Sequence, residues 1–387
     1  MNQLRIEIGL LALIHSLQHV YLNALPPLYL LLRSDFNVST FQIGLIGSVS
    51  GLVSILQGPA GYLVERIGGK RLAVLSMIGC SATVFLYSLA PSFEVLLILT
   101  AIFALAQVTF HPATYAMVVN RAAASHRGKF ISYHQVGGFI GSAVGTAVIA
   151  ALAASQGWRT TLQIIPVLGL GIIVIFWRLV SDQSVSRSPS SSSTNPSSSS
   201  QKPFHMTTPL LVLILSISIL SLGNLQQYIP LFLTEAYGET VAWAGILTSI
   251  MHAVGSISSL LGGSASDKYD QSSVMISAQI GIALTTILLA VGQFTSAILL
   301  FVLILYGVAR YFPVPAQHTL SSITAAGHPQ GIGFSYTGIA LGQIFAAPLI
   351  GYLIDVLGAR SAFFFCSIFP VISASILVIF KKIRKTN

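Results

Sequence analysis

Charged residues are scarce in this chain. Aspartate, glutamate, lysine and arginine make up 7% of its 387 residues, whereas 54% are hydrophobic. Soluble domains carry about 25% charged residues, so the composition excludes an ordinary soluble protein. The balance is basic, with 19 lysines and arginines against 10 acids. The basic residues are scattered between apolar segments, so no nucleic-acid partner is expected.

Cysteines are few and nucleotide-binding motifs are absent. Cys80 and Cys366 both fall in apolar segments, so we expect packing roles and no disulfide framework. The sequence contains no Gly-x-x-x-x-Gly-Lys-Ser/Thr loop, which disfavours a nucleotide-driven pump. It also lacks a cofactor fingerprint and an evident intramembrane acid–base pair. A membrane enzyme or sensor is therefore disfavoured, and no cofactor is expected.

Long apolar runs dominate instead. A helix needs about 20 apolar residues to cross a bilayer, and twelve stretches qualify. We expect the first to be a retained helix and not a signal peptide, which predicts an all-α membrane protein with twelve transmembrane helices. The stretches are residues 5–32, 41–64, 72–90, 94–119, 129–154, 159–181, 208–234, 242–265, 273–292, 296–317, 329–354 and 360–380.

A serine-rich stretch divides these segments into two sets of six. Residues 182–206 contain two serine runs and no apolar pattern, which is typical of a flexible linker. The predicted domains are a six-helix bundle over 1–181 and a second over 207–387. Lysine and arginine gather on the cytoplasmic side of membrane proteins, and only Arg33, Arg159 and Arg360 fall on the opposite side here. Both termini and the linker are thus predicted to be cytoplasmic, in a cell (inner or plasma) membrane.

The two sets of helices echo each other in sequence. Pro27-Leu28-Tyr29-Leu30 corresponds to Pro230-Leu231-Phe232-Leu233, and Gly157-Trp158-Arg159 corresponds to Gly358-Ala359-Arg360. Internal repeats of this kind are typical of secondary transporters, whose substrate site lies between the repeats near mid-membrane. The repeat predicts two pseudo-symmetric bundles.

A short charged turn occurs once in each half. The first runs from Gly61 to Arg71, and a weaker copy begins at Gly263. The small residue allows close helix approach, and the acid would suit a helix N-terminus. We predict a conformational latch in which the two acids pair with the opposite half and close the cytoplasmic side. Its residues are Gly61, Glu65, Arg66, Lys70, Arg71, Asp267 and Lys268.

The stretch from Gly61 to Arg71 resembles the signature of the major facilitator superfamily, with Glu65 where aspartate is usual. Within that superfamily the chain is most similar to the fosmidomycin-resistance type. This resemblance implies the major facilitator fold and an inner-membrane efflux carrier driven by protons. Many proton-coupled members have an acid in the first helix, where this chain has His19. The residues that carry the closer likeness are His15 with Leu17, Gln42-Ile43-Gly44, Leu56-Gln57-Gly58-Pro59, Phe110-His111-Pro112 and Gln135-Val136-Gly137-Gly138.

Polar side chains inside the predicted helices form the candidate substrate site. An ionisable group at the bilayer centre costs about 2.5–3.5 kcal/mol on insertion scales, so each needs a reason. His15, His19 and Asn23 recur at i, i+4 and i+8, so these three polar side chains share one face of the first predicted helix. The candidates are Arg310, His19, His15, Asn23, His111, Tyr115, His252, Gln227 and Gln343.

Arg310 and His19 receive specific roles. Arginine does not lose its charge in proteins, so Arg310 would anchor an anionic substrate group; alternatively it is satisfied by helix carbonyls and water, or pairs with Asp355 or Glu7. Histidine titrates near neutrality, so His19 would carry the coupling proton; alternatively it is a neutral, hydrogen-bonded residue. His15 and His19 have metal-ligand spacing, but no further ligand is adjacent in sequence, so no metal is expected.

Three glycines in the fifth helix, Gly137, Gly141 and Gly145, recur at four-residue spacing. This pattern indicates tight helix packing, and it also resembles the exporter motif of the superfamily, with Ser142 where proline is usual. We expect this helix to move against the partner half.

The pattern as a whole predicts a monomeric secondary transporter that works by alternating access. Its function would be proton-coupled efflux, as an antiporter, of a small anionic or amphiphilic compound of the drug or antibiotic resistance type. The alternative is proton-coupled uptake of an organic acid or another small metabolite.

Overall fold

The computed structural model describes residues 2–121, 127–181, 210, 225–324 and 329–386, and over these residues its secondary structure consists of helices joined by short turns and contains no strand. Ten helical segments of this part are long and apolar enough to cross a membrane. Each of them overlaps one of the predicted stretches. The prediction of an all-α, multi-pass membrane protein is confirmed.

The remaining two predicted crossings have separate explanations. The stretch 41–64 is divided between α3 (Thr40–Ser54), which is 15 residues long, and α4 (Gln57–Ile67). The stretch 208–234 lies mostly outside the described residues, and its visible end is the short helix η3 (Gln226–Tyr228) followed by α11 (Ile229–Tyr237). The predicted linker over 182–206 also lies outside them.

Several crossings are interrupted, mostly beside prolines. Proline removes a backbone donor and clashes with the preceding turn, and Pro26, Pro112 and Pro313 lie at such interruptions. The first crossing consists of α1 (Asn2–Leu22), η1 (Pro26–Leu28) and α2 (Tyr29–Phe36). The others are α6 (Phe93–Gln107) with α7 (Phe110–Arg121), α14 (Ser296–Tyr311) with α15 (Val314–Thr324), and α17 (Ala359–Cys366) with α18 (Ile368–Thr386).

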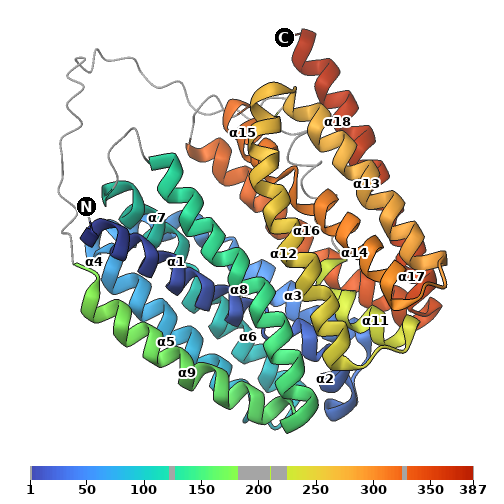
Figure 1. Ribbon diagram of the computed structural model, residues 1–387, viewed down its shortest axis with the longest axis horizontal. Helices are drawn as coiled ribbons and strands as arrows, with labels where there is room; N and C mark the ends of the chain where they lie inside the picture. Colours follow the sequence, from blue (N-terminus) through green and yellow to red (C-terminus); the bar gives the residue numbers. More distant parts are fainter. Residues whose placement is uncertain (1, 122–126, 182–209, 211–224, 325–328, 387) are drawn as a thin grey trace.

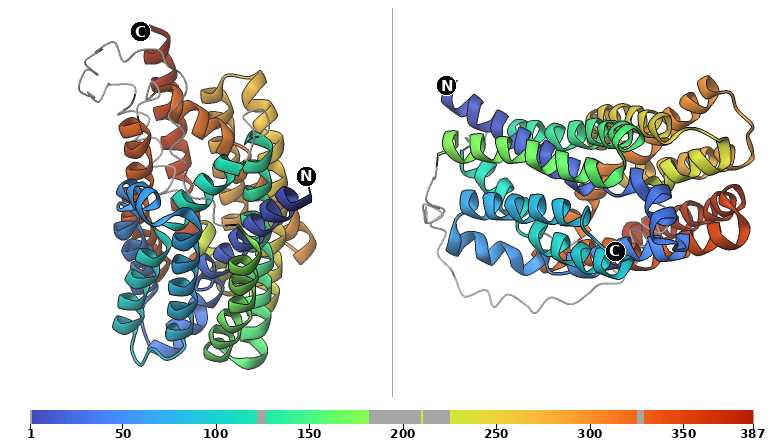
Figure 2. Two further views of the ribbon diagram at one scale, coloured as in Figure 1. Left: turned by 90° about the vertical axis from the view of Figure 1, so that its left-hand side faces the viewer. Right: turned by 90° about the horizontal axis from the view of Figure 1, so that it is seen from below.

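The continuous helices form the walls of two halves that lie side by side (Figures 1 and 2). We call α1 to α9 the N-terminal half and η3 to α18 the C-terminal half. The halves meet mainly where α3 packs on α16 and where α8 packs on α12. The continuous helices are α5 (Gly69–Tyr87), α8 (Arg127–Gln156), α9 (Trp158–Leu179), α12 (Val241–Lys268), α13 (Gln271–Val291) and α16 (Pro329–Leu357).

The repeat seen in the sequence has a structural counterpart at Gly157 and Gly358. Their φ angles are 80° and 79°, values that favour glycine because it has no Cβ. In each half the arginine two residues later donates hydrogen bonds to carbonyl groups at or just past a helix C-terminus, where such groups lack helical partners. The same capped helix end is therefore present once in each half. The carbonyls are those of Ser88 and Ala90 for Arg159, and of Ala290 and Gly292 for Arg360.

The glycine row of α8 packs within its own half. Gly137, Gly141 and Gly145 lie against Ala12, Ser16 and Val20 of α1. The face of α8 that meets the partner half is a different one, where Ala150 contacts Gly245 of α12. The row therefore joins α8 to α1 and does not itself form the surface between the halves.

Candidate functional site

A cavity of about 330 Å³ lies between the two halves. Its volume is at the lower end of the range of about 300–1,000 Å³ that is typical of small-molecule sites. Lining residues come from α1, η1, α2, α3, α5, α6, α7 and α8 on one side and from η3, α11, α12 and α16 on the other. Of the predicted substrate residues, five line it: Asn23, His111, Gln227, His252 and Gln343.

The interrupted crossings bring polar groups to this cavity. Asn23 and Pro26 follow the end of α1, and Gln226 and Gln227 belong to η3 at the corresponding place in the other half. Irregular backbone at membrane depth is tolerated where it lines a cavity. The irregular backbone at η1 and η3 thus marks the site.

The lining is polar but carries no formal charge apart from its histidines. Among the described residues around the cavity, none is aspartate, glutamate, lysine or arginine. Sequence reasoning missed much of this lining because a single hydroxyl or amide in an apolar helix often serves only its own backbone. The missed polar residues are Tyr21, Tyr29, Ser50, Ser54, Tyr87, Thr100, Gln107, Thr146 and Thr248.

Tyr311 connects the C-terminal side of the cavity to Arg310. Its hydroxyl accepts a hydrogen bond from Gln226 Nε2 at 2.9 Å and lies 2.7 Å from His252 Nδ1. The guanidinium carbon of Arg310 is 5.8 Å from the centre of the Tyr311 ring. Arg310 is half-buried and is not among the lining residues. It therefore lies beside Tyr311 and does not line the cavity.

The two acids considered as partners of Arg310 are bonded elsewhere. Glu7 forms a buried ion pair with Arg121 at 2.6 Å, and Asp355 accepts hydrogen bonds from the start of α3. Pairing of Arg310 with either acid is therefore wrong for this structure.

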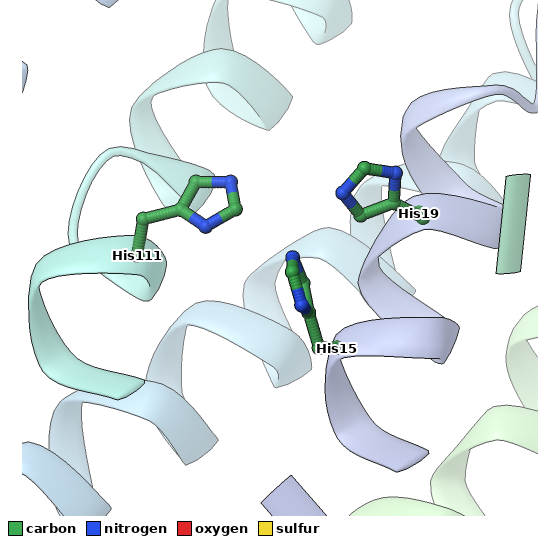
Figure 3. A group of neighbouring side chains, drawn as sticks. All are labelled: His15, His19 and His111. Atoms are coloured by element: carbon green, nitrogen blue, oxygen red, sulfur yellow. The ribbon is translucent and has the colours of Figure 1, made fainter. Parts of the chain in front are cut away.

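Four histidines of the N-terminal half cluster beside the cavity, and three of them, His15, His19 and His111, point toward one another in Figure 3. The centre of the His15 ring is 4.7 Å from that of His19, 5.2 Å from that of His111 and 4.1 Å from that of His134, on which it stacks. His111 lines the cavity, whereas His15 and His134 are buried. Tyr115 lies 6.1 Å from the His111 ring, away from the cavity lining.

Hydrogen bonds orient three of these rings. His15 Nδ1 is 2.7 Å from the carbonyl oxygen of His134, and His134 Nδ1 is 3.1 Å from that of Leu11. A carbonyl only accepts, so each Nδ1 must carry the proton. His19 Nδ1 lies 2.8 Å from Ser142 Oγ, which also accepts from Asn23 at 3.2 Å.

One end of the seam between the halves is held by polar contacts. The backbone N–H groups of Thr40 and Phe41, at the start of α3, donate to the Asp355 carboxylate at 2.9 and 2.7 Å. A carboxylate at a helix N-terminus is stabilised by the free N–H groups and the helix dipole. Arg33 also forms an ion pair with Glu235. We call Arg33, Thr40, Phe41, Glu235 and Asp355 the lock.

Between the lock and the cavity, α3 and α16 touch backbone to backbone. A Cβ added at Gly44 would clash with the backbone of Ala347 and Pro348, and Ser48 donates to the Ile344 carbonyl. Sequence reasoning missed the lock because its partners come from opposite halves. Its one local signal was the helix start at Ser39, whose side chain caps α3.

The predicted latch lies away from the lock, at the ends of α4 and α12 (Figure 1). The surroundings of Gly61 and the side chains of Glu65 and Asp267 are outside the described set, so the pairing of the two acids stays a prediction. Arg66 lies over the ring of Tyr62 at 4.5 Å and Lys70 over that of Trp177 at 4.6 Å, both within their own half. Arg71 begins the same helix as Lys70, and Lys268 is exposed.

Near the second latch copy, Asp270 joins α13 to α18. It accepts a hydrogen bond from Ser273 and pairs with Lys381 at 3.1 Å. Partial burial acts to raise the pKa of Asp270, but the hydrogen bonds from Lys381 and Ser273 outweigh it and hold that pKa below its usual value. This ion pair therefore persists at neutral pH.

Comparisons with known proteins agree with this architecture. The sequence profile of the Major Facilitator Superfamily matches residues 11–328. The chain is 25% identical to the fosmidomycin resistance protein of Escherichia coli (strain K12) over 373 residues, which cover 94% of this chain and 90% of that protein. It is 26% identical to the nitrite extrusion protein of Bacillus subtilis (strain 168) over 66% of this chain and 64% of that protein.

Solved structures show the same fold. A bacterial homologue of the human lysosomal transporter Spinster, in an inward-facing and occupied conformation, superimposes with a TM-score of 0.79 at 17% identity, covering 97% of this chain and 96% of that one. The nucleoside transporter NupG superimposes with a TM-score of 0.79 at 16% identity, covering 99% and 100% of the two chains.

Proposed function

We propose that this chain, which belongs to the Major Facilitator Superfamily and is therefore a membrane transporter and not an enzyme, exports a small anionic or amphiphilic compound in exchange for protons. The observation that carries the proposal is the cavity between the halves, lined from both sides, together with the lock that joins the halves at one end of their seam. Alternating access then requires a second state in which the lock opens and the predicted latch closes.

In this proposal the lock faces the outside and both termini face the cytoplasm, as the distribution of basic residues favours. The cavity is then accessible from the cytoplasmic side, where a compound to be exported is captured. The protein works as a monomer, because the cavity is formed by the two halves of one chain. Similarity to two relatives, a fosmidomycin resistance protein and a nitrite extrusion protein, favours export over the alternative of organic-acid uptake.

The neutral polar lining suits the polar part of an amphiphilic compound, and Arg310, beside Tyr311, supplies positive potential near the cavity. Ligand and proton must each bind the two states with different affinity, or no transport results. His19 is the proposed proton carrier because it is bonded to Ser142 and lies beside His111, which lines the cavity.

Everted membrane vesicles test both export and coupling. Energised vesicles that contain the protein are expected to accumulate fosmidomycin, used here as the probe, and an uncoupler should abolish the accumulation. One proton per cycle moved across 100 mV is worth about 2.3 kcal/mol, which sustains a roughly fifty-fold gradient from that potential alone. His19→Gln should lose this gradient yet retain exchange of labelled for unlabelled probe.

His318→Gln is the matched control, because His318 is exposed on α15. Accumulation by His19→Gln at the level of the control would remove the proton role from His19. Accumulation that resists the uncoupler would contradict proton coupling altogether. Uptake by intact cells, without accumulation in everted vesicles, would favour the organic-acid alternative.

Removing the positive charge of Arg310, which lies near the cavity, is expected to weaken anion binding. At about 8 Å and an effective dielectric constant of about 40, one charge contributes about 1 kcal/mol, or roughly fivefold in affinity. Arg310→Gln should therefore raise the KM for fosmidomycin about fivefold. Arg310→Lys keeps the positive charge, so its KM should stay close to that of the parent. Equal KM values in Arg310→Gln and the parent would show that Arg310 has no part in anion recognition.

A further inference from the structure

We infer that His15, His19 and His111 form a binding site for one divalent transition-metal ion of the zinc, cobalt and nickel class. The site lies in the N-terminal half, beside the cavity, and does not depend on the proposed export. Its ligands come from two turns of α1 and from the start of α7 (Figure 3). The sequence showed only the first pair, because the third ligand is far away along the chain.

The ligand atoms are already close together. One ring nitrogen from each of the three histidines lies within 4.8 Å of the others. A zinc–imidazole bond measures about 2.0–2.1 Å, so small ring rotations would bring all three nitrogens into a coordination sphere. Gly138 of α8 leaves the space for this, since a Cβ there would lie 2.8 Å from both His15 Cε1 and His19 Nε2.

The rings also present the required lone pairs. His15 donates its Nδ1–H to a backbone carbonyl, so its Nε2 is the bare nitrogen. This is the outer-shell arrangement that orients metal-binding histidines. His15 is 1% exposed, and its Nε2 and His111 Nδ1 are buried with no hydrogen-bond partner among the described residues. Buried polar atoms without partners are costly, and a metal ion would satisfy both of these.

The donor set selects a class of ion. Imidazole nitrogens suit zinc, nickel and copper, whereas magnesium and calcium prefer carboxylate and carbonyl oxygens. No aspartate or glutamate occurs in the described part of this cluster or of the cavity wall. His111 lines the cavity, which gives the ion a route of entry and leaves a coordination position for water.

The test uses the full-length chain in detergent, purified without a histidine tag and stripped with a chelator. Cobalt(II) alone is added and followed by its visible ligand-field bands, and equilibrium dialysis gives the number of zinc ions bound. We expect one ion per chain, bands that indicate nitrogen ligation, and no displacement by excess magnesium. His19→Gln and His111→Gln should each bind at least tenfold more weakly, whereas His318→Gln should bind like the parent.

Each variant is also melted with and without zinc, so that a folding defect is distinguishable from a lost site. A folded His111→Gln chain whose Tm no longer rises with zinc supports the site. No bound ion in the parent, or equal affinity in the parent and both cluster variants, would overturn it. Metal binding and export can fail separately, since dialysis needs no transport and the vesicle assay can be run with chelator present.

Discussion

Asp355→Asn is expected to transport at about one tenth of the parent rate or less. The Asp355 carboxylate accepts the Thr40 and Phe41 N–H groups across the two halves, and asparagine keeps the shape but loses the charge. Hydrogen bonds to charged groups contribute about 1.5–3 kcal/mol. Their loss would shift the equilibrium between the two states about 10–150-fold toward the open lock, so the protein would spend most of each cycle in one state.

The shift can be measured apart from transport. A cysteine placed at Ser50, which lines the cavity, should react with a membrane-impermeant thiol reagent added on the lock side much faster in Asp355→Asn than in the parent. The native cysteines, Cys80 and Cys366, are both buried and should contribute little background.

Asp35→Asn is the matched control at the same end. Asp35 pairs with Arg159 at 2.9 Å within the N-terminal half, and both side chains are about 40% exposed. Exposed ion pairs of this kind contribute about 0–1 kcal/mol. The transport and labelling rates of Asp35→Asn should therefore stay close to those of the parent. Asp355→Glu keeps the carboxylate and should recover part of the transport rate that Asp355→Asn loses. The lock would be refuted if Asp355→Asn showed the labelling rate of Asp35→Asn.

Gly141→Ala is expected to cause the largest loss of stability. Its added Cβ would meet the carbonyl group and Cα of Ser16 in α1, which are backbone atoms and do not rotate away. Overpacking of this kind typically costs about 1–3 kcal/mol, and occasionally more. Movement of α8 away from α1 would also displace Ser142, which is hydrogen-bonded to His19. We expect less folded protein by size-exclusion chromatography and a Tm several degrees lower.

Gly9→Ala is the control within α1. Gly9 is exposed, and a Cβ added there meets nothing within 4 Å. Alanine is favoured over glycine in a helix by about 0.5–1 kcal/mol, so Gly9→Ala should be as stable as the parent or more so. Equal Tm values for Gly141→Ala and Gly9→Ala would contradict the proposed close approach of α8 and α1.

The candidate site was predictable only in part. Asn23, His111, Gln227, His252 and Gln343 line the cavity as their polarity suggested, because a polar group in an apolar helix avoids lipid. Hydroxyl-bearing lining residues gave no such signal, since serine and threonine can bond to their own helix. Arg310, the most conspicuous polar residue of the sequence, does not line the cavity and lies beside Tyr311 instead.

Hydrophobic length and the spacing of basic residues were enough to establish a membrane bundle with an internal repeat. The reason is that each crossing must satisfy its own backbone hydrogen bonds within the bilayer. The length of a crossing is therefore evident from its own stretch of apolar residues. Gly157 and Gly358 were likewise recognisable, because a positive φ restricts the residue type at a single position.

Only the tertiary structure decided which polar side chains meet. That outcome depends on the rotation and depth of each helix, which are set by packing against its neighbours and not by its own residues. Thr40 and Asp355 are 315 residues apart in the chain, and His111 reaches His15 and His19 because α7 restarts beside α1 after the break before Pro112. The lock and the histidine cluster are both products of this packing.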